Sequence, residues 1–373
     1  MKESEKEVDW VSLLPCCIWL HIITFLTTKE AVQICTLSKR WRNLWKYIPT
    51  FKASRLDFQR AEFFNNFLSE ALLHRDASTA LRYVNVQRNE FIPYRILYKL
   101  FKYASSHDVE HLTIDSKSCG NDLQHMLLSS SMFSCHSLKY LNLALHRTSG
   151  RAIFPCTLDL PQLVECHLKD IAFTSCMDNG YADPFSTCEK LRTLTIDGCT
   201  LFNAEVLYVR NDELVNLSLR FDILIIRPCH VLICAPKLSS FTYISRLTRQ
   251  NCTRELFEHD LHFLKEVCLE VWSCEALTPV IAMTFKCWLK RFTNVTSMTL
   301  SLAALKVLST IPGFPDIEHV PFSNLKLLTL KHDPYIPVPY AVLSYLLQGS
   351  TNVKIATLEE VPSYYQVYGL PFF

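Results

Sequence analysis

Glycine is scarce in this chain, with 7 glycines among 373 residues, where average usage would give roughly 26. Phosphate-binding loops use glycine where backbone amides must approach a ligand closely. No two glycines here are separated by a single residue, so the glycine spacing of those loops is missing. The Rossmann and P-loop classes of nucleotide-binding protein are therefore excluded.

An excess of charge of either sign is also missing. Lys and Arg number 38 and Asp and Glu number 36, which gives a net charge of +2. This balance provides no overall attraction to nucleic acid or to an anionic membrane, and neither is expected as a partner. The chain is 49% hydrophobic, so it can bury a large core and wholesale disorder is excluded.

Cysteine spacing and hydrophobic runs exclude two further classes. The 16 cysteines contain no Cys-x-x-Cys motif and fall well below the roughly 8–10% of disulfide scaffolds. Many, such as Cys234 and Cys268, have apolar neighbours, which indicates core filling in a reducing compartment, the cytoplasm and/or nucleus. The candidate membrane run, residues 11–26, is shorter than the roughly 20 residues of a span and follows an acidic segment.

Residues 11–47 carry the pattern of three short helices. Apolar residues recur every four positions at Leu14, Ile18 and Ile22, as on one face of an amphipathic helix. The Thr-x-x-Glu spacing of residues 27–30 predicts a capping box and a second helix from about residue 28. A third helix is expected after Ser38, with two tryptophans on one face. So many large apolar side chains in so small a unit indicate a protein-binding surface.

These residues resemble the F-box of plant F-box proteins. The resemblance rests on Leu13-Leu-Pro15, on TKEAV at 28–32 and on LSKRWRNLW at 37–45. It implies that the three helices insert into a Skp-type adaptor and through it join a cullin ubiquitin ligase. Two departures, Cys16-Cys17 in place of an acidic pair and Leu26-Thr27 in place of Leu-Pro, leave a decayed F-box as an alternative. The adaptor contacts carried over by position are Leu14, Pro15, Ile18, Ile22, Leu26, Val32, Leu37, Trp41 and Trp45.

Beyond residue 80 a hexamer of the form apolar-x-x-apolar-x-apolar recurs every 23 to 31 residues, from Leu81 to Val353. This period is typical of a leucine-rich repeat solenoid, in which each hexamer is a short strand of a parallel sheet. Residues 95–101, 123–128 and 340–347 carry helical patterns between strands. The expected fold class is α/β, an irregular horseshoe with strands inside and helices outside.

The resemblance extends over nearly the whole chain. Residues 61–76 look like the helix that follows the F-box in plant F-box proteins with leucine-rich repeats, and residues from 322 resemble the opening of the C-terminal FBD region. We expect an F-box domain at 8–50, a linking helix at 51–79 and a solenoid at 80–373 with a partial FBD-like end from about 322.

Residue patterns typical of enzyme active sites are weak in this sequence. The cluster Glu258-His259-Asp260 with His262 lacks the H-E-x-x-H spacing, and no nucleophile is paired with a base by spacing. We therefore expect no catalysis, no metal and no cofactor; a cysteine-dependent hydrolase is the enzyme alternative. Exposed strand positions predict a target-binding concave face at Tyr83, Tyr140, His167 and Arg192.

The resemblance implies a substrate-recognition subunit of a Skp–cullin–F-box ubiquitin ligase, whose repeats hold an unknown target protein for ubiquitination. The alternative is a leucine-rich repeat scaffold with a decayed F-box and no ligase role. Some relatives also bind a small-molecule co-ligand in the horseshoe, although no residue pattern here points to such a pocket.

Overall fold

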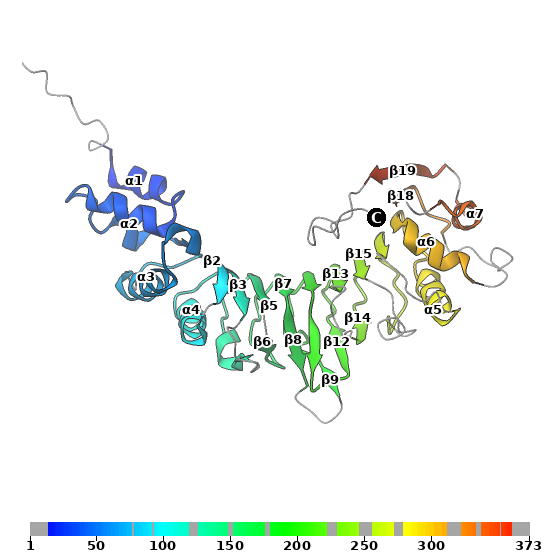
Figure 1. Cartoon of the computed structure of the whole chain (residues 1–373), viewed down its shortest axis with the longest axis horizontal. Helices are drawn as coiled ribbons and strands as arrows, with labels where there is room; N and C mark the ends of the chain where they lie inside the picture. The colour runs from blue at the N-terminus through cyan, green and yellow to red at the C-terminus, as the bar shows by residue number, and fades with distance from the viewer. Residues whose placement is uncertain are drawn as a thin grey trace, which may run out of the picture.

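The computed structural model describes residues 14–76, 78–91, 93–118, 126–147, 152–175, 180–221, 230–245, 256–271, 279–311, 322–332, 337–350 and 352–359. A small helical unit lies at the amino end, and a curved stack of parallel strands follows it (Figure 1). The α/β class and the order of the two parts agree with the sequence-based prediction.

The helical unit contains α1 (Cys16–Ile23), α2 (Thr28–Thr36) and a 3₁₀ helix, η1 (Leu44–Tyr47). The capping box is present, because Thr27 Oγ1 accepts from the Glu30 amide at 3.3 Å and the Glu30 carboxylate accepts from the Thr27 amide at 2.8 Å. The prediction of a third α-helix after Ser38 was wrong. Asn43 leaves the helical region at φ −119°, ψ 1°, so turns precede the single 3₁₀ turn.

One parallel sheet of twelve strands forms the concave side. Eleven strands overlap the predicted hexamers, and β1 adds a further strand before residue 80, in the region where the F-box was expected to end and a linking helix to follow. That segment also contains η2 (Arg55–Asp57) and α3 (Ala61–His74). In spatial order the strands are β1 (Thr50–Ser54), β2 (Tyr83–Phe91), β3 (His111–Ser118), β5 (Tyr140–Arg147), β7 (Glu165–Lys169), β10 (Thr193–Asp197), β13 (Asn216–Phe221), β15 (Ser240–Ser245), β16 (Glu266–Val271), β17 (Ser297–Ser301), β18 (Leu327–His332) and β19 (Lys354–Glu359).

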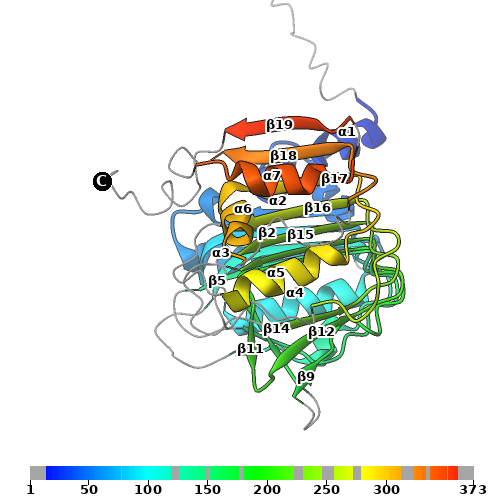
Figure 2. The same ribbon diagram turned by 90° about the vertical axis from the view of Figure 1, so that its right-hand side faces the viewer.

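Helices line the outer side only towards the two ends of the described stack: α4 (Tyr94–Ser106), then α5 (Pro279–Lys290), α6 (Leu302–Ser309) and α7 (Tyr340–Leu347) (Figures 1 and 2). The middle is backed by two further parallel sheets instead. The helix expected at 123–128 was wrong where the structure describes it, because Met126–Leu127 is strand β4. The two sheets comprise β4, β6 (Ala152–Phe154), β8 (Ile171–Thr174) and β11 (Thr200–Phe202), and β9 (Tyr181–Ala182), β12 (Val206–Arg210) and β14 (His230–Cys234).

The two shortest repeats of the stack lie in this strand-backed middle. From β10 to β13 and from β13 to β15 the strands begin only 23 and 24 residues apart. An extended residue advances about 3.3 Å and a helical residue about 1.5 Å, so an extended return segment covers the outer side with fewer residues.

The core lies between the concave sheet and these outer layers. Alternate strand residues such as Leu194 and Ile196 have no exposed surface. Cys166, Cys188 and Cys199 are fully buried among them, as core filling requires. Cys156, by contrast, is disulfide-bonded, which departs from the expectation of thiols throughout. No helix of the described residues is long and apolar enough to cross a membrane.

Candidate functional site

The exposed apolar face of the helical unit is built by α1, α2 and the turns that follow them. Ile18 and Ile22 of α1 are 44% and 38% exposed, and Leu37, just after α2, is 76% exposed. Phe25, which position-by-position comparison with the F-box did not select, is 71% exposed between the two helices. We call Ile18, Ile22, Phe25 and Leu37 the aliphatic–aromatic face.

The predicted adaptor contacts divide between this face and the interior. Trp41 and Trp45 are only 7% and 9% exposed, and the Trp41 ring lies 4.2 Å from the ring of Trp19, centroid to centroid. They therefore form a core that holds the helices together. Of the remaining contacts, Pro15 is exposed, and three pack partly buried against that core: Leu14, Leu26 and Val32.

Polar contacts join the helical unit to the first strand of the sheet. The buried Thr28 hydroxyl accepts from the Lys52 amide at 2.9 Å, and Lys52 Nζ donates to the Thr24 carbonyl at 3.2 Å. Arg75, at the end of α3, donates to the Ile48 carbonyl at 2.6 Å. Burial lowers the pKa of Arg75, although a guanidinium stays charged at neutral pH. The helical unit is thus fastened to the sheet by side chains on both parts.

The concave face carries a row of four neighbouring rings near this junction. Tyr83 and His111 stack at 4.5 Å, His111 and Tyr140 lie 5.7 Å apart, and Tyr140 and His167 5.5 Å apart, all between ring centroids. These four residues, which we call the ring ladder, come from the neighbouring strands β2, β3, β5 and β7. Three of them are predicted target contacts, and the structure adds His111 between Tyr83 and Tyr140.

Arg192, the fourth predicted target contact, lies elsewhere. It is exposed but precedes the first residue of β10, where its carbonyl accepts from the amides of Val215 and Asn216. Its side chain therefore belongs to the rim at the amino ends of the strands. Beyond the ladder, the positions in register with His167 are small and polar: Thr195, Ser218 and Thr242.

Charges on the ladder and beside it are paired. His167 Nε2 lies 2.8 Å from Glu165 Oε1, and Lys169 Nζ lies 3.1 Å from Asp197 Oδ2 on the next strand. Both pairs are partly exposed, so each contributes little to stability. Their effect is to leave the ladder as a ring-lined strip without a strong excess of one charge.

Three buried cysteines of the repeat core are poorly suited to act as nucleophiles. Cys166 and Cys188 are buried in the repeat core, and burial raises both thiol pKa values, that of Cys188 to about 12. Cys199 is buried as well, and its thiol donates to the Leu168 carbonyl at 3.6 Å. A thiol that stays protonated is a poor nucleophile, so these positions give no support to hydrolase chemistry.

Comparison with protein families connects the helical unit to a known module. Residues 11–52 match the family model described as the F-box domain. Residues 11–52 are thus identified as an F-box domain. This match covers α1, α2 and η1 and ends within β1.

The chain is similar to plant proteins whose names combine an F-box with leucine-rich repeats or an FBD region. It is 29% identical to F-box/LRR-repeat protein 13 of Arabidopsis thaliana over 58% of this chain and 47% of that protein. It is 27% identical to a putative F-box/LRR-repeat protein over 96% of this chain and 73% of that protein, and 25% identical to an FBD-associated F-box protein over 96% and 78%, both of the same plant. The resemblance predicted from the sequence is confirmed.

Two limits apply to these similarities. The chain spans about half the length of the first curated relatives it matches, at 47% and 48% of their residues. An internalin from Listeria monocytogenes superposes over 89% of this chain and 94% of its own at 12% identity, with a TM-score of 0.34, which is too low to support an argument.

Proposed function

We propose that this protein is a substrate-recognition subunit of a Skp–cullin–F-box ubiquitin ligase. The observation that carries the proposal is the F-box match at residues 11–52, together with the exposed apolar side chains of Ile18, Ile22 and Leu37 on that module. Several exposed large apolar side chains on one small module are typical of a protein interface. The partner would be a Skp-type adaptor, and through it a cullin, in the cytoplasm and/or nucleus.

The repeats would hold the target protein on the concave face. The ring ladder offers Tyr83, Tyr140 and His167, since tyrosine rings supply large contact areas at a low entropy cost. Arg192 would contribute a charge from the rim. The proposed boundaries are an F-box at 8–50, a linking segment at 51–79 and a solenoid from 80 with a partial FBD-like end.

In this role the protein makes and breaks no covalent bond. Its contribution is geometric. It would hold the target near a ubiquitin-conjugating enzyme that carries ubiquitin, which raises the effective concentration of the target's lysines at that enzyme. The contacts of Thr28 with Lys52 and of Arg75 with Ile48 support such a role, because they fasten the F-box to the sheet that would carry the target.

Adaptor binding by the purified full-length protein tests the proposal. We expect wild type to bind a Skp-type adaptor and Ile18→Asp or Ile22→Asp to lose roughly tenfold or more in affinity, because a carboxylate would be buried at the interface. Leu73→Asp is the matched control, since Leu73 is 72% exposed on α3, outside the F-box. Failure of wild type to bind any Skp-type adaptor contradicts the proposal.

A scaffold with a decayed F-box is the second candidate. One observation favours it: Cys16 and Cys17, which replace the acidic pair usual in the F-box, are both exposed at the start of α1. Adaptor affinity in the micromolar range or weaker, unchanged by Ile18→Asp, would support the scaffold and count against a ligase role.

A further inference from the structure

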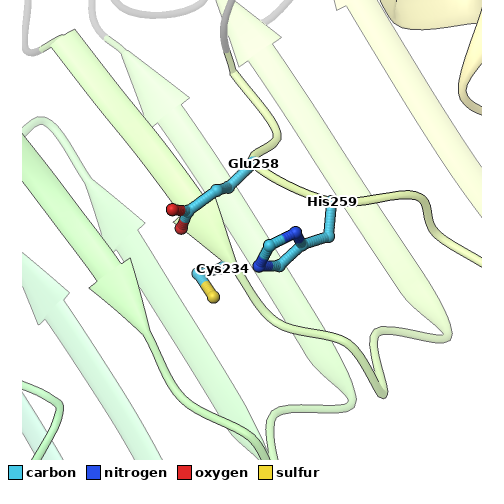
Figure 3. A group of neighbouring side chains, drawn as sticks. All are labelled: Cys234, Glu258 and His259. Atoms are coloured by element: carbon cyan, nitrogen blue, oxygen red, sulfur yellow. The ribbon is translucent and has the colours of Figure 1, made fainter.

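On the outer side of the solenoid, three side chains of different chemistry converge (Figure 3). Cys234 is the last residue of β14, an edge strand of the outer sheet β14-β12-β9. Glu258 and His259 directly follow Phe257, which forms a bridge with Ile233. The thiol, the carboxylate and the imidazole thus come from two chain segments that belong to successive repeats.

Backbone hydrogen bonds fix these two segments against each other. The Ile233 amide donates to the Leu256 carbonyl at 2.8 Å, and the Glu258 amide donates to the Ile233 carbonyl at 2.9 Å. The Cys234 carbonyl in turn accepts from the Asn211 amide at 3.0 Å. The positions from which the three side chains project are therefore set by the solenoid ladder and do not depend on a bound group.

The three donor atoms are close enough to share one ion. The thiol sulfur, a carboxylate oxygen and an imidazole nitrogen all lie within 4.8 Å of one another. Zinc binds sulfur at about 2.3 Å and nitrogen or oxygen at about 2.0–2.2 Å, which places tetrahedral ligands somewhat under 4 Å apart. Small rotations of these partly or fully exposed side chains close the difference. Mixed sulfur, nitrogen and oxygen donors suit zinc and exclude magnesium and calcium, which require oxygen ligands.

The groups around the cluster already orient its carboxylate. The Tyr208 hydroxyl donates to Glu258 Oε2 at 2.5 Å, and this bond lowers the pKa of Glu258. Burial, followed by the neighbouring carboxylate of Glu258, raises the pKa of the Cys234 thiol. Arg210, whose guanidinium lies over the Tyr208 ring, is engaged by Asp183 at 3.3 Å. An outer partner that holds a ligand in place is a regular feature of metal sites.

We propose that Cys234, Glu258 and His259 form a site for a divalent metal ion of the zinc type, with a fourth position open to water. On binding, the Cys234 S–H proton is released to solvent and a metal–sulfur bond forms, so that one thiolate and one carboxylate balance the two positive charges of the ion. The ion would join the edge of β14 to the segment that leads into β16. This proposal is independent of the F-box and differs from the sequence-based expectation of no metal.

Titration of the purified full-length protein with cobalt(II), followed by competition with zinc, tests the site. We expect a thiolate-to-cobalt charge-transfer absorption that saturates at one equivalent, disappears with zinc and is accompanied by release of one proton per ion. Cys234→Ser should abolish the absorption, and His259→Ala should weaken cobalt binding by about tenfold or more. Circular dichroism verifies that both variants remain folded.

Matched controls come from neighbouring residues with the same chemistry. Cys287→Ser removes another exposed thiol, on α5, and His262→Ala removes an exposed imidazole three residues beyond His259. Both should bind cobalt as wild type does. The proposal is overturned if wild type shows no thiolate absorption, if Cys234→Ser retains it, or if Cys287→Ser loses it.

Discussion

Substitution of Trp41 tests whether this residue stabilises the interior of the F-box or contacts the adaptor. Although the family resemblance gives Trp41 an adaptor-contact role, its side chain is 93% buried by its own chain, with 7% exposed, and packs on Trp19 at 4.2 Å between ring centroids. Trp41→Ala should therefore lower the stability of the F-box before any adaptor is present. Leu37→Ala, at a position that is 76% exposed, should leave stability unchanged.

The expected cost follows from burial. Truncating a buried tryptophan to alanine costs roughly 3–5 kcal/mol, because the lost transfer free energy adds to the cost of a cavity. The indole Nε1 of Trp41 is buried and has no hydrogen-bond partner among the described residues. Trp41→Phe should consequently cost much less, since it keeps most of the ring and removes an unsatisfied donor worth about 1–3 kcal/mol. Leu37→Ala should remain within about 0.5 kcal/mol of wild type.

Native-state hydrogen exchange of α1 and α2 is the appropriate assay, because repeat proteins need not unfold in one step. We expect Trp41→Ala to speed exchange in both helices, Trp41→Phe to do so weakly, and Leu37→Ala to leave it unchanged while weakening adaptor binding. Unchanged exchange in Trp41→Ala combined with lost adaptor binding would refute the reasoning, since the indole would then act at the interface alone.

Two further predictions concern the repeats. The buried Ser301 hydroxyl accepts from the Val271 and Ala304 amides and donates to the Val271 carbonyl, so Ser301→Ala should destabilise β16 and α6 by about 2–4 kcal/mol in native-state hydrogen exchange; Ser309→Ala, at an exposed hydroxyl of α6, is the control, and equal exchange rates in the two variants would contradict the assignment. Gly198 has φ +64°, and a Cβ there would lie 2.5 Å from Asp170 Oδ1, so Gly198→Ala should destabilise the neighbouring strands by at least about 1 kcal/mol in the same assay, a result contradicted by unchanged hydrogen exchange.

Local signals predicted the parts of the fold that depend on neighbouring residues. The capping box of Thr27 and Glu30 needs only three residues of spacing, and it formed as expected. The repeat strands were visible because the same apolar hexamer recurs. Strand β1 also fits the hexamer, with Ile48, Phe51 and Ala53 buried at its three apolar positions, but it lies before residue 80, where the sequence was interpreted as the F-box and a linking helix. The outer strands were missed because short apolar runs do not distinguish a strand from a helix.

The clusters of side chains were hidden for a different reason. Tyr208, Cys234 and Glu258 lie on successive turns of the solenoid, 26 and 24 residues apart, and so do Tyr83, His111 and Tyr140, 28 and 29 residues apart. A search for chemical groups close together in sequence overlooks them. A comparison of residues one repeat apart would have placed His111 next to Tyr83 and Tyr140, and Cys234 next to Glu258.

The strand-backed middle repeats also determine how the distance between the F-box and the carboxyl-terminal repeats can change. Neighbouring strands are about 4.8 Å apart, whereas a helix with its side chains is about 10 Å wide. Repeats backed by helices are therefore wedge-shaped and turn the stack, while repeats backed by strands are nearly parallel-sided and extend it. Gain or loss of one middle repeat would move the F-box relative to the carboxyl-terminal repeats by about one strand spacing, with little change in their mutual orientation. Lineages could thus adjust the span between the two ends in small linear steps.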